Sequence, residues 1–395
     1  MVLPQGLRSW VRRTVILQRT IEHLRTVRLR RTHPLGIIPD APSRIIVEPT
    51  NACNLKCGFC GNKDMLRPWT YLPMDLYEQL IGEMVELDIP RITLHTIGES
   101  TMNPNLPDMV RIAKAAGLVA TLSTNGTLLS EELVRKLVHA GPDILNVSVD
   151  AADPAAFKAI RPGIDPAGVL AGMKRLKRIR DAEGPLRDSP WGEVRLPTLV
   201  GTCVITPYFD RAEEMRFFET YGPLVDDFFF HWPNNHANYA HDEPHRLRSL
   251  IPRKAQDWLY KKVRQSCSYP WDALFLLSDG TMSVCRFDFD ARVKVGRFGP
   301  QSIRELWHSE AMQSLRRAHM TFDFRDWSTC EDCSATWYEN RHEHYTTSQK
   351  IKRRNGYVAA RNAWLTLDPM KQRAALGSGT VESEVGKKLA VTGRG

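Results

Sequence analysis

The feature that most constrains the fold is a regular alternation of two kinds of segment between residues 44 and 231. Short apolar runs with the length of buried strands alternate with longer segments whose apolar residues recur at steps of three and four. Strands that are separated by helices predict parallel pairing, because a helical crossover returns the chain to the same end of the sheet. The expected fold class is therefore α/β. The expected strands are 44–48, 91–95, 118–123, 144–149, 199–205 and 225–231, and the expected helices are 75–87, 106–116, 131–140, 166–182 and 211–221.

Three cysteines directly follow the first expected strand. Cys53, Cys57 and Cys60 have the spacing C-x3-C-x2-C. Three thiolates on one loop suit three irons of a [4Fe–4S] cluster and leave the fourth iron open to a small ligand. A structural zinc site fits this spacing poorly, because zinc prefers four protein ligands in paired knuckles. The loop therefore predicts a cluster that binds a molecule as well as passing electrons.

This triplet, with Phe59 before its third cysteine, resembles the radical S-adenosylmethionine (radical SAM) superfamily. In that family the open iron chelates the amino and carboxylate groups of SAM. Reductive cleavage of SAM then gives a 5′-deoxyadenosyl radical, which takes a hydrogen atom from the substrate. The resemblance implies a partial (βα)6 TIM-like barrel with SAM and a three-cysteine [4Fe–4S] cluster as cofactors. It also implies that Phe59 packs near the adenine.

The next motif follows the second expected strand. Gly98-Glu99 resembles the family's G-G-E-P motif, where the backbone and the glutamate engage the SAM amino group. Ile97 and Ser100 depart from that motif. The resemblance assigns Glu99 to the SAM ammonium, which a carboxylate would hold through a charge-assisted hydrogen bond.

Two further strand ends carry SAM-related motifs. Ser123 and Asn125 belong to a stretch that resembles the S/T-N-G motif near the ribose, and Ser148 resembles the serine of S-x-D that faces SAM. Asp150, the last residue of that motif, is expected to face SAM or to serve as a structural cap. Arg161 matches the position of an arginine that often binds the SAM carboxylate, with a surface arginine as the alternative.

A second set of cysteines comprises Cys267, Cys285, Cys330 and Cys333. The Asp279-Gly280 pair is a hairpin turn signal, which places Cys285 after the second strand of a hairpin. Four thiolates suit either a fully ligated [4Fe–4S] cluster or a structural zinc site, and the spacing leaves both open. Residues 267–333 resemble the SPASM domain or its shortened form, twitch. The resemblance implies one auxiliary [4Fe–4S] cluster that is held by all four cysteines and transfers electrons.

The pattern divides the chain into five parts. We expect a small SPASM/twitch iron–sulfur domain to follow the barrel. The predicted parts are a basic amphipathic N-terminal helix (1–38), the radical SAM core (39–235), a connector (236–265), the SPASM/twitch domain (266–345) and a basic helix with a disordered tail (346–395).

The net charge of +9 is concentrated at the N-terminus, where residues 1–35 hold eight arginines and one acid. The rest of the chain is close to neutral, so no nucleic-acid partner is expected. The basic helix is predicted to pack on the main domain or to contact an anionic membrane surface or acidic partner. No apolar stretch approaches the roughly 18 residues of a membrane span, and no secretory signal is recognisable. The expected location is cytoplasmic, with a membrane-peripheral alternative.

These features predict an oxidoreductase that oxidises or epimerises a polyol or sugar-like small molecule. The auxiliary cluster would conduct the electron, and flavodoxin or ferredoxin would supply the reductant. Cys203 is predicted to be a buried core residue or, alternatively, a hydrogen donor to a substrate radical. His95 is expected to be a hydrogen-bonded barrel residue. The alternatives are a peptide maturase, acting by crosslinking or epimerisation, and a non-catalytic iron–sulfur or zinc protein that binds a partner.

Overall fold

The computed structural model describes residues 38–187, 194–206, 208–231, 266–331 and 333. The predicted N-terminal helix, the connector and the C-terminal tail lie outside these residues. None of the described helices is both long enough and apolar enough to cross a membrane.

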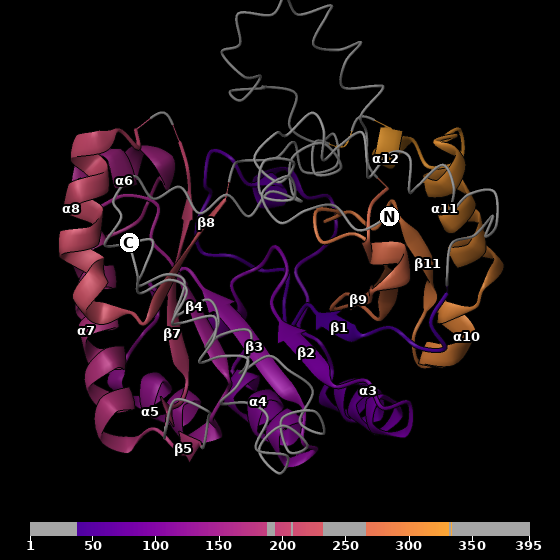
Figure 1. Cartoon of the computed structure of the whole chain (residues 1–395), viewed down its shortest axis with the longest axis horizontal. Coiled ribbons are helices and arrows are strands. Elements are labelled where there is room, and N and C mark those ends of the chain that lie inside the picture. The colour runs from indigo at the N-terminus through magenta and orange to yellow at the C-terminus, as the bar shows by residue number, and fades with distance from the viewer. Residues whose placement is uncertain (1–37, 188–193, 207, 232–265, 332, 334–395) are drawn as a thin grey trace, which may run out of the picture.

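One nine-stranded sheet organises the described chain, in the order β11-β10-β9-β1-β2-β3-β4-β7-β8. The six strands from β1 to β8 in this order pair in parallel, which confirms the predicted α/β class (Figure 1). The sheet ends at β8 on one edge and at β11 on the other, so the barrel stays open. All six predicted strands are present to within two residues. They are β1 (Arg44–Val47), β2 (Arg91–Leu94), β3 (Val119–Thr124), β4 (Ile144–Ser148), β7 (Thr198–Val204) and β8 (Asp227–His231).

The predicted crossover helices are also confirmed to within two residues. Several begin at a side chain that accepts a backbone N–H of the first turn, as Ser130 does for Leu133 and Asp210 does for Glu213. Such caps satisfy donors that the helix itself leaves unpaired. The sequence pattern missed α6 (Pro154–Ile160) and the small hairpin of β5 (Leu186–Arg187) and β6 (Val194–Arg195). The confirmed helices are α3 (Met74–Glu86), α4 (Leu106–Ala115), α5 (Glu131–Ala140), α7 (Pro166–Glu183) and α8 (Arg211–Tyr221).

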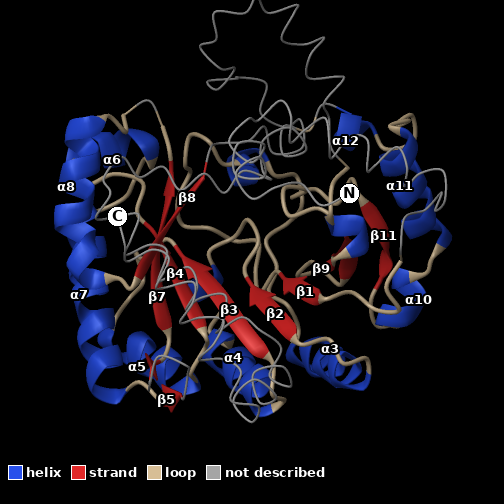
Figure 2. Cartoon of the chain, in the orientation of Figure 1, coloured by secondary structure: helices blue, strands red, loops and turns tan. Residues whose placement is uncertain are grey.

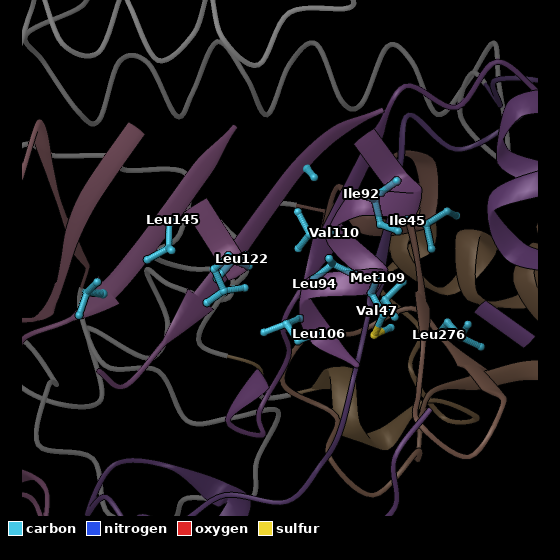
Figure 3. Packing of buried hydrophobic residues seen from close by; sticks show 14 of the residues in the cluster. Ile45, Val47, Ile92, Leu94, Leu106, Met109, Val110, Leu122, Leu145 and Leu276 are labelled. Atoms are coloured by element: carbon cyan, nitrogen blue, oxygen red, sulfur yellow. The ribbon is translucent and has the colours of Figure 1, made fainter. Parts of the chain in front are cut away.

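The main core lies between the sheet and its helices. Buried residues alternate with partly exposed ones along β2, β3 and β4, so one face of these strands is apolar and the other is more polar. The apolar face packs against α4 (Figure 3). Residues of this contact are Ile45, Val47, Ile92, Leu94, Leu122 and Leu145 from the strands and Leu106, Met109 and Val110 from the helix.

The C-terminal segment extends this same sheet. β9 (Ala273–Leu276) pairs in parallel with β1, and β10 (Thr281–Ser283) and β11 (Lys294–Arg297) follow as antiparallel neighbours. Helices lie beside β11, as Figure 2 shows. The region that carries the second cysteine set is therefore attached, through β9, to β1, and the first cysteine set follows β1 directly. The helices are α10 (Ile303–Trp307), α11 (Glu310–Thr321) and α12 (Ser328–Glu331).

Candidate functional site

The first cysteine set lies on the loop that leaves β1 at the carboxyl end of the sheet. Burial raises the pKa of Cys53 to about 11 and that of Cys60 to about 12, and the neighbouring cysteines contribute further to both shifts. The pKa of Cys57 is also raised, mainly by burial. The three sulfurs are therefore close neighbours that resist ionisation together. Such a donor set fits a cationic cluster, because metal ligands must be deprotonated and the metal stabilises that form.

Arg161 and Asp150 form a buried ion pair beside this loop. Arg161 Nε donates to Asp150 Oδ2 at 2.5 Å, and the guanidinium carbon lies 5.7 Å from the Phe59 ring centroid. Burial opposes the charge of Arg161, but Asp150 and then Cys57 raise its pKa overall. Arg161 is only 6% exposed, so the alternative of a surface arginine is wrong. Asp150 also accepts from Val204 N at 2.8 Å, so it ties the end of β4 to β7.

Glu99 is buried at the end of β2, and protein donors surround its carboxylate. Oε1 accepts hydrogen bonds from the backbone and hydroxyl of Thr101 and from Thr124 Oγ1, and Oε2 accepts one from Asn125 N at 2.6 Å. Three of these donors share Oε1, whereas Oε2 accepts only one and keeps a second acceptor site. In this structure Glu99 therefore joins the end of β2 to the end of β3, and its contact with the SAM ammonium stays a prediction.

Gly98 permits a close approach between the end of β2 and the cluster loop. A Cβ atom at this position would lie 2.1 Å from the Thr50 carbonyl oxygen. The next residue donates a hydrogen bond from Glu99 N to Ala52 O at 2.8 Å. Any side chain at residue 98 would therefore displace the loop that carries the cysteines.

The remaining SAM-motif residues lie along neighbouring strand ends. Asn125 Nδ2 donates to Asn54 Oδ1 at 2.8 Å, which connects β3 to the cluster loop. Ser123 Oγ accepts a hydrogen bond from Asn146 Nδ2 at 3.1 Å, and Ser148 Oγ accepts one from Thr202 Oγ1 at 3.2 Å. The fold thus brings residues that are distant in the sequence to one edge of the sheet.

The inner face of the parallel sheet, opposite the helices, is rich in uncharged polar side chains. In parallel strands, residues in register point to the same face. The pairs Thr93–Thr121, Ser123–Asn146 and Ser148–Thr202 therefore share one face, and the hydrogen bonds of the last two pairs agree with this. These side chains are partly exposed, whereas their sequence neighbours are buried in the core. We call this surface the inner polar face; its members are Thr93, Thr121, Ser123, Asn146, Ser148 and Thr202.

His95 continues this face at the end of β2 and differs from the prediction. Its Nδ1 is buried and has no hydrogen-bond partner among the described residues, so the expected satisfied role is wrong. Burial, and secondly the positive charge of Arg286, lower the pKa of His95 to about 3. The imidazole is therefore neutral near pH 7. The only sequence signal for an unpaired histidine here was its position directly after β2, where Thr93 and His95 fall on the same face of the strand.

Cys203 lies on the opposite side of the sheet. It neighbours Thr202, whose side chain is on the inner face, so alternation along β7 directs Cys203 toward the helices. The thiol is fully buried, and its pKa is raised mainly by burial. The prediction of a buried core residue is confirmed. A thiol in this position does not reach the inner face in this conformation.

The second cysteine set is assembled from three segments of the C-terminal region. Burial raises the pKa of Cys285, and the negative charges of Cys333, Asp288 and Cys330 raise it further. Cys267 approaches α11, because its backbone N–H donates to His319 Nδ1 at 3.4 Å. All eight cysteines lie among the described residues, and none forms a disulfide. Across the described ranges, no three His, Cys, Asp or Glu side chains converge as a single ion requires.

An open α/β barrel with a three-thiol loop at its carboxyl edge and a second thiol set on an added hairpin defines a class of iron–sulfur enzymes. Residues 47–181 match the model of the radical SAM superfamily, and residues 267–334 match an iron–sulfur cluster-binding domain, SPASM. The chain therefore belongs to the radical SAM superfamily of enzymes. Its cofactors are SAM and [4Fe–4S] clusters.

Individual relatives differ in what they act on. The chain is 35% identical over 230 residues to an AdoMet-dependent heme synthase of Methanosarcina barkeri, covering 58% of this chain and 60% of that protein. It is 32% identical over 122 residues to a PqqA peptide cyclase of Streptomyces rochei, covering 30% and 33%. The structure of Streptococcus suis SuiB bound to precursor peptide SuiA matches with a TM-score of 0.56 and 14% identity, over 76% and 71% of the two chains. The chain spans between a third and three fifths of the length of the curated relatives it matches.

Proposed function

We propose that this enzyme oxidises an uncharged, hydroxyl-bearing small molecule, such as a polyol or a sugar. The observation that carries the proposal is the inner polar face, whose members offer hydroxyl and amide groups. The charged residues that share this face by alternation, Arg91 and Asp227, lie at the first positions of β2 and β8, at the end of the sheet away from the cysteine loop. Hydroxyl and amide groups exchange hydrogen bonds with hydroxyls and leave no buried charge unpaired. His95 adds a neutral acceptor at the carboxyl end of the sheet.

Within this proposal the two cysteine sets hold two [4Fe–4S] clusters. With SAM bound, the first cluster would supply the 5′-deoxyadenosyl radical that takes a hydrogen atom from the substrate, and the second would accept an electron from the resulting substrate radical. The chain's own residues bind and orient these groups. We assign Cys53, Cys57 and Cys60 to the first cluster, Cys267, Cys285, Cys330 and Cys333 to the second, and Phe59, Gly98, Glu99, Ser123, Asn125, Ser148 and Arg161 to the surroundings of SAM.

Oxidation is favoured over epimerisation by the placement of Cys203. An epimerase returns a hydrogen atom to the substrate radical, which requires a donor such as a thiol beside the substrate. Cys203 is the one cysteine outside the two sets, and it is buried among core residues on the helix side of β7. We therefore propose that the substrate radical loses an electron.

Peptide maturation is the second candidate, and two of the similar proteins support it. A PqqA peptide cyclase is among the relatives, and a similar fold binds a precursor peptide in SuiB. Backbone amides of a peptide would also find partners on the inner polar face. The two candidates differ in what should stimulate SAM cleavage.

The experiment is anaerobic reconstitution, followed by assay of 5′-deoxyadenosine with a panel of cyclic polyols and uncharged sugars in D2O, with an aminocyclitol as the charged comparison. Oxidation predicts that one compound stimulates cleavage and yields a product two mass units lighter. A product of unchanged composition, with one inverted stereocentre and one solvent deuterium at that centre, would identify epimerisation and overturn the oxidation proposal. Stimulation by a peptide alone would favour the second candidate.

We also propose that flavodoxin or ferredoxin reduces the first cluster by docking at its loop. Lys56 and Lys63 are exposed on and beside this loop, and a basic surface attracts an acidic donor. Charge reversal in Lys56→Glu/Lys63→Glu should slow reduction by flavodoxin and leave reduction by dithionite unchanged. Equal slowing with both reductants would argue against docking at this surface.

A further inference from the structure

Residues 61–72, which follow the third cysteine of the first set, lie against the loop that leaves β1. Asn51 holds this segment with both ends of its side chain: Nδ2 donates to Pro68 O and Oδ1 accepts from Thr70 N, each at 2.8 Å. Leu72 N donates to Pro49 O at 2.9 Å. The segment is therefore fixed to the chain on the N-terminal side of the first cysteine set.

The same segment is hydrogen-bonded on its other side to the loops of the antiparallel strands β9–β11 (residues 273–297), which we call the auxiliary hairpin. Arg67 Nε donates to Phe289 O at 2.7 Å, and Leu66 N donates to Asp290 Oδ1 at 2.8 Å. The hydroxyls of Thr70 and Ser278 are 2.6 Å apart. These contacts join residues more than two hundred positions apart in the sequence. Phe289 and Asp290 follow Cys285 closely in the sequence, so the segment connects the first cysteine set to the chain that continues from Cys285.

A buried ion pair stands at the centre of these contacts. Arg67 Nη2 donates to Glu48 Oε1 at 2.6 Å, and the Glu48 side chain is 1% exposed. Glu48 also accepts hydrogen bonds from Ser278 N, from Ser278 Oγ and from Thr96 Oγ1. A buried carboxylate is tolerated only when its oxygens are paired. The end of β1, the 61–72 segment and the hairpin therefore satisfy this charge only when all three are in place.

Steric contact at Gly61 reinforces this arrangement. Gly61 follows Cys60 directly, and a Cβ atom there would lie 2.0 Å from the ring of Phe289. The backbone beside the first cysteine set therefore packs onto a side chain close to Cys285.

We infer that Arg67 and Glu48 are positioning residues that hold the two cysteine loops together and thereby set the separation of the two clusters. The inference rests on the part of the proposed function that places a cluster on each cysteine set, and it is independent of the substrate. Electron transfer between redox centres weakens steeply with distance. A fixed spacer between the loops would therefore serve any reaction in which the auxiliary cluster takes part.

The test compares the full-length holoenzyme with Arg67→Gln and Glu48→Gln, the double variant Glu48→Gln/Arg67→Gln, and Arg111→Gln as a control. Arg111 pairs with Asp108 on the exposed face of α4, far from both sets in the sequence. Pulsed EPR of the doubly reduced protein measures the spin–spin coupling between the clusters, and hydrogen exchange measures the opening of residues 278–290. Iron content and the SAM-shifted EPR signal establish that both clusters are present.

We expect both single variants to broaden the distribution of cluster separations and to speed exchange at residues 278–290 by about tenfold. In the double variant, the changes in cluster separation and exchange rate should be smaller than the sum of the changes in the two single variants. The reason is that the double variant leaves no buried charge unpaired. Arg111→Gln should match the wild type. Wild-type coupling and exchange in Arg67→Gln, with both clusters present, would overturn the inference.

Two further outcomes remain decisive. If Arg67→Gln does not fold, Thr70→Val removes the contact with Ser278 without unpairing a charge, and it should change coupling and exchange in the same direction by a smaller amount. Unchanged values in Thr70→Val would then count against the inference. A wild-type protein with a single cluster would refute the auxiliary-cluster part of the proposed function, and the exchange data alone would then decide whether Arg67 fixes the hairpin.

Discussion

The two cysteine sets are built in different ways. The first lies within residues 53–60, on one loop at the end of one strand. The second is spread over residues 267–333: Cys267 lies before η4 (Tyr269–Trp271), Cys285 follows β10, Cys330 lies in α12, and Cys333 follows that helix in the sequence. The first set therefore depends on local chain geometry, whereas the second depends on a hairpin and helices that must first fold around it.

β1 connects these two regions physically. Its one edge pairs with β2, which starts the barrel, and its other edge pairs with β9, which starts the hairpin. The cluster loop that follows β1 thus lies between both regions. The second cysteine set has no compact sequence motif of its own. Its region is positioned instead by the pairing of β9 with β1, the strand that leads into the C-x3-C-x2-C loop.

The largest effect is expected from removing a ligand of the first set. Cys57→Ala should abolish SAM cleavage, because the first cluster would lose one of its three thiolates. The measurement is 5′-deoxyadenosine formation with dithionite as reductant. Cys203→Ala, whose thiol packs on the helix side of β7, is the matched control and should retain cleavage. Residual cleavage by Cys57→Ala would contradict the assignment of SAM cleavage to a cluster held by the first cysteine set.

Removing a ligand of the second set should separate cleavage from turnover. Cys330→Ala is expected to retain uncoupled SAM cleavage and to stop product formation, because only the electron acceptor is lost. The measurement is the ratio of product to 5′-deoxyadenosine. Normal product from this variant would contradict an electron-transfer role for the auxiliary cluster.

A smaller effect, on stability, is expected at the junction of β2 and β3. Glu99→Gln replaces an oxygen that accepts hydrogen bonds with an amide that donates, so it should lower the free energy of unfolding by about 2 kcal/mol. Urea denaturation of the reconstituted protein measures this change. Glu78→Gln, on the exposed part of α3, should remain within about 0.5 kcal/mol of the wild type. Equal stability of the two variants would show that Glu99 is not a structural link.

The smallest effect is expected at His95. His95→Phe should raise the substrate KM by about tenfold, the value of one neutral hydrogen bond, and leave uncoupled SAM cleavage unchanged. A rise in uncoupled cleavage or no change in KM would remove His95 from the substrate contact.

The depressed pKa of His95 also predicts a pH dependence of stability. The folded imidazole, with a pKa of about 3, stays neutral while the unfolded one takes up a proton near pH 6.5. The wild type should therefore lose stability as the pH falls from about 6.5 toward 3, and His95→Phe should lose less over the same range. NMR titration of labelled histidine gives the pKa directly, and a value near 6.5 would contradict the burial of this ring.

Local patterns were sufficient for much of this molecule. Hydrophobic periodicity predicted six strands and five crossover helices of the parallel sheet, since each depends on which face of a short segment is apolar, but it missed α6 and the place of β9 in this sheet. The C-x3-C-x2-C loop predicted the first site because its three thiols are near one another in any compact loop. Arg161 and Cys203 were left with two interpretations each, because burial and side-chain direction depend on neighbours that are distant in the sequence.

The sequence by itself thus determined the α/β class, the first cysteine set and the order of the SAM-related motifs. Only the tertiary structure decided that β9 joins β1, that Glu99 accepts hydrogen bonds from the ends of β2 and β3, and that Arg67 and Glu48 link the two cysteine regions. The physical reason is that periodicity and close spacing act over a few residues. Strand pairing between distant segments, and the pairing of a buried charge, depend instead on which surfaces meet when the whole chain folds.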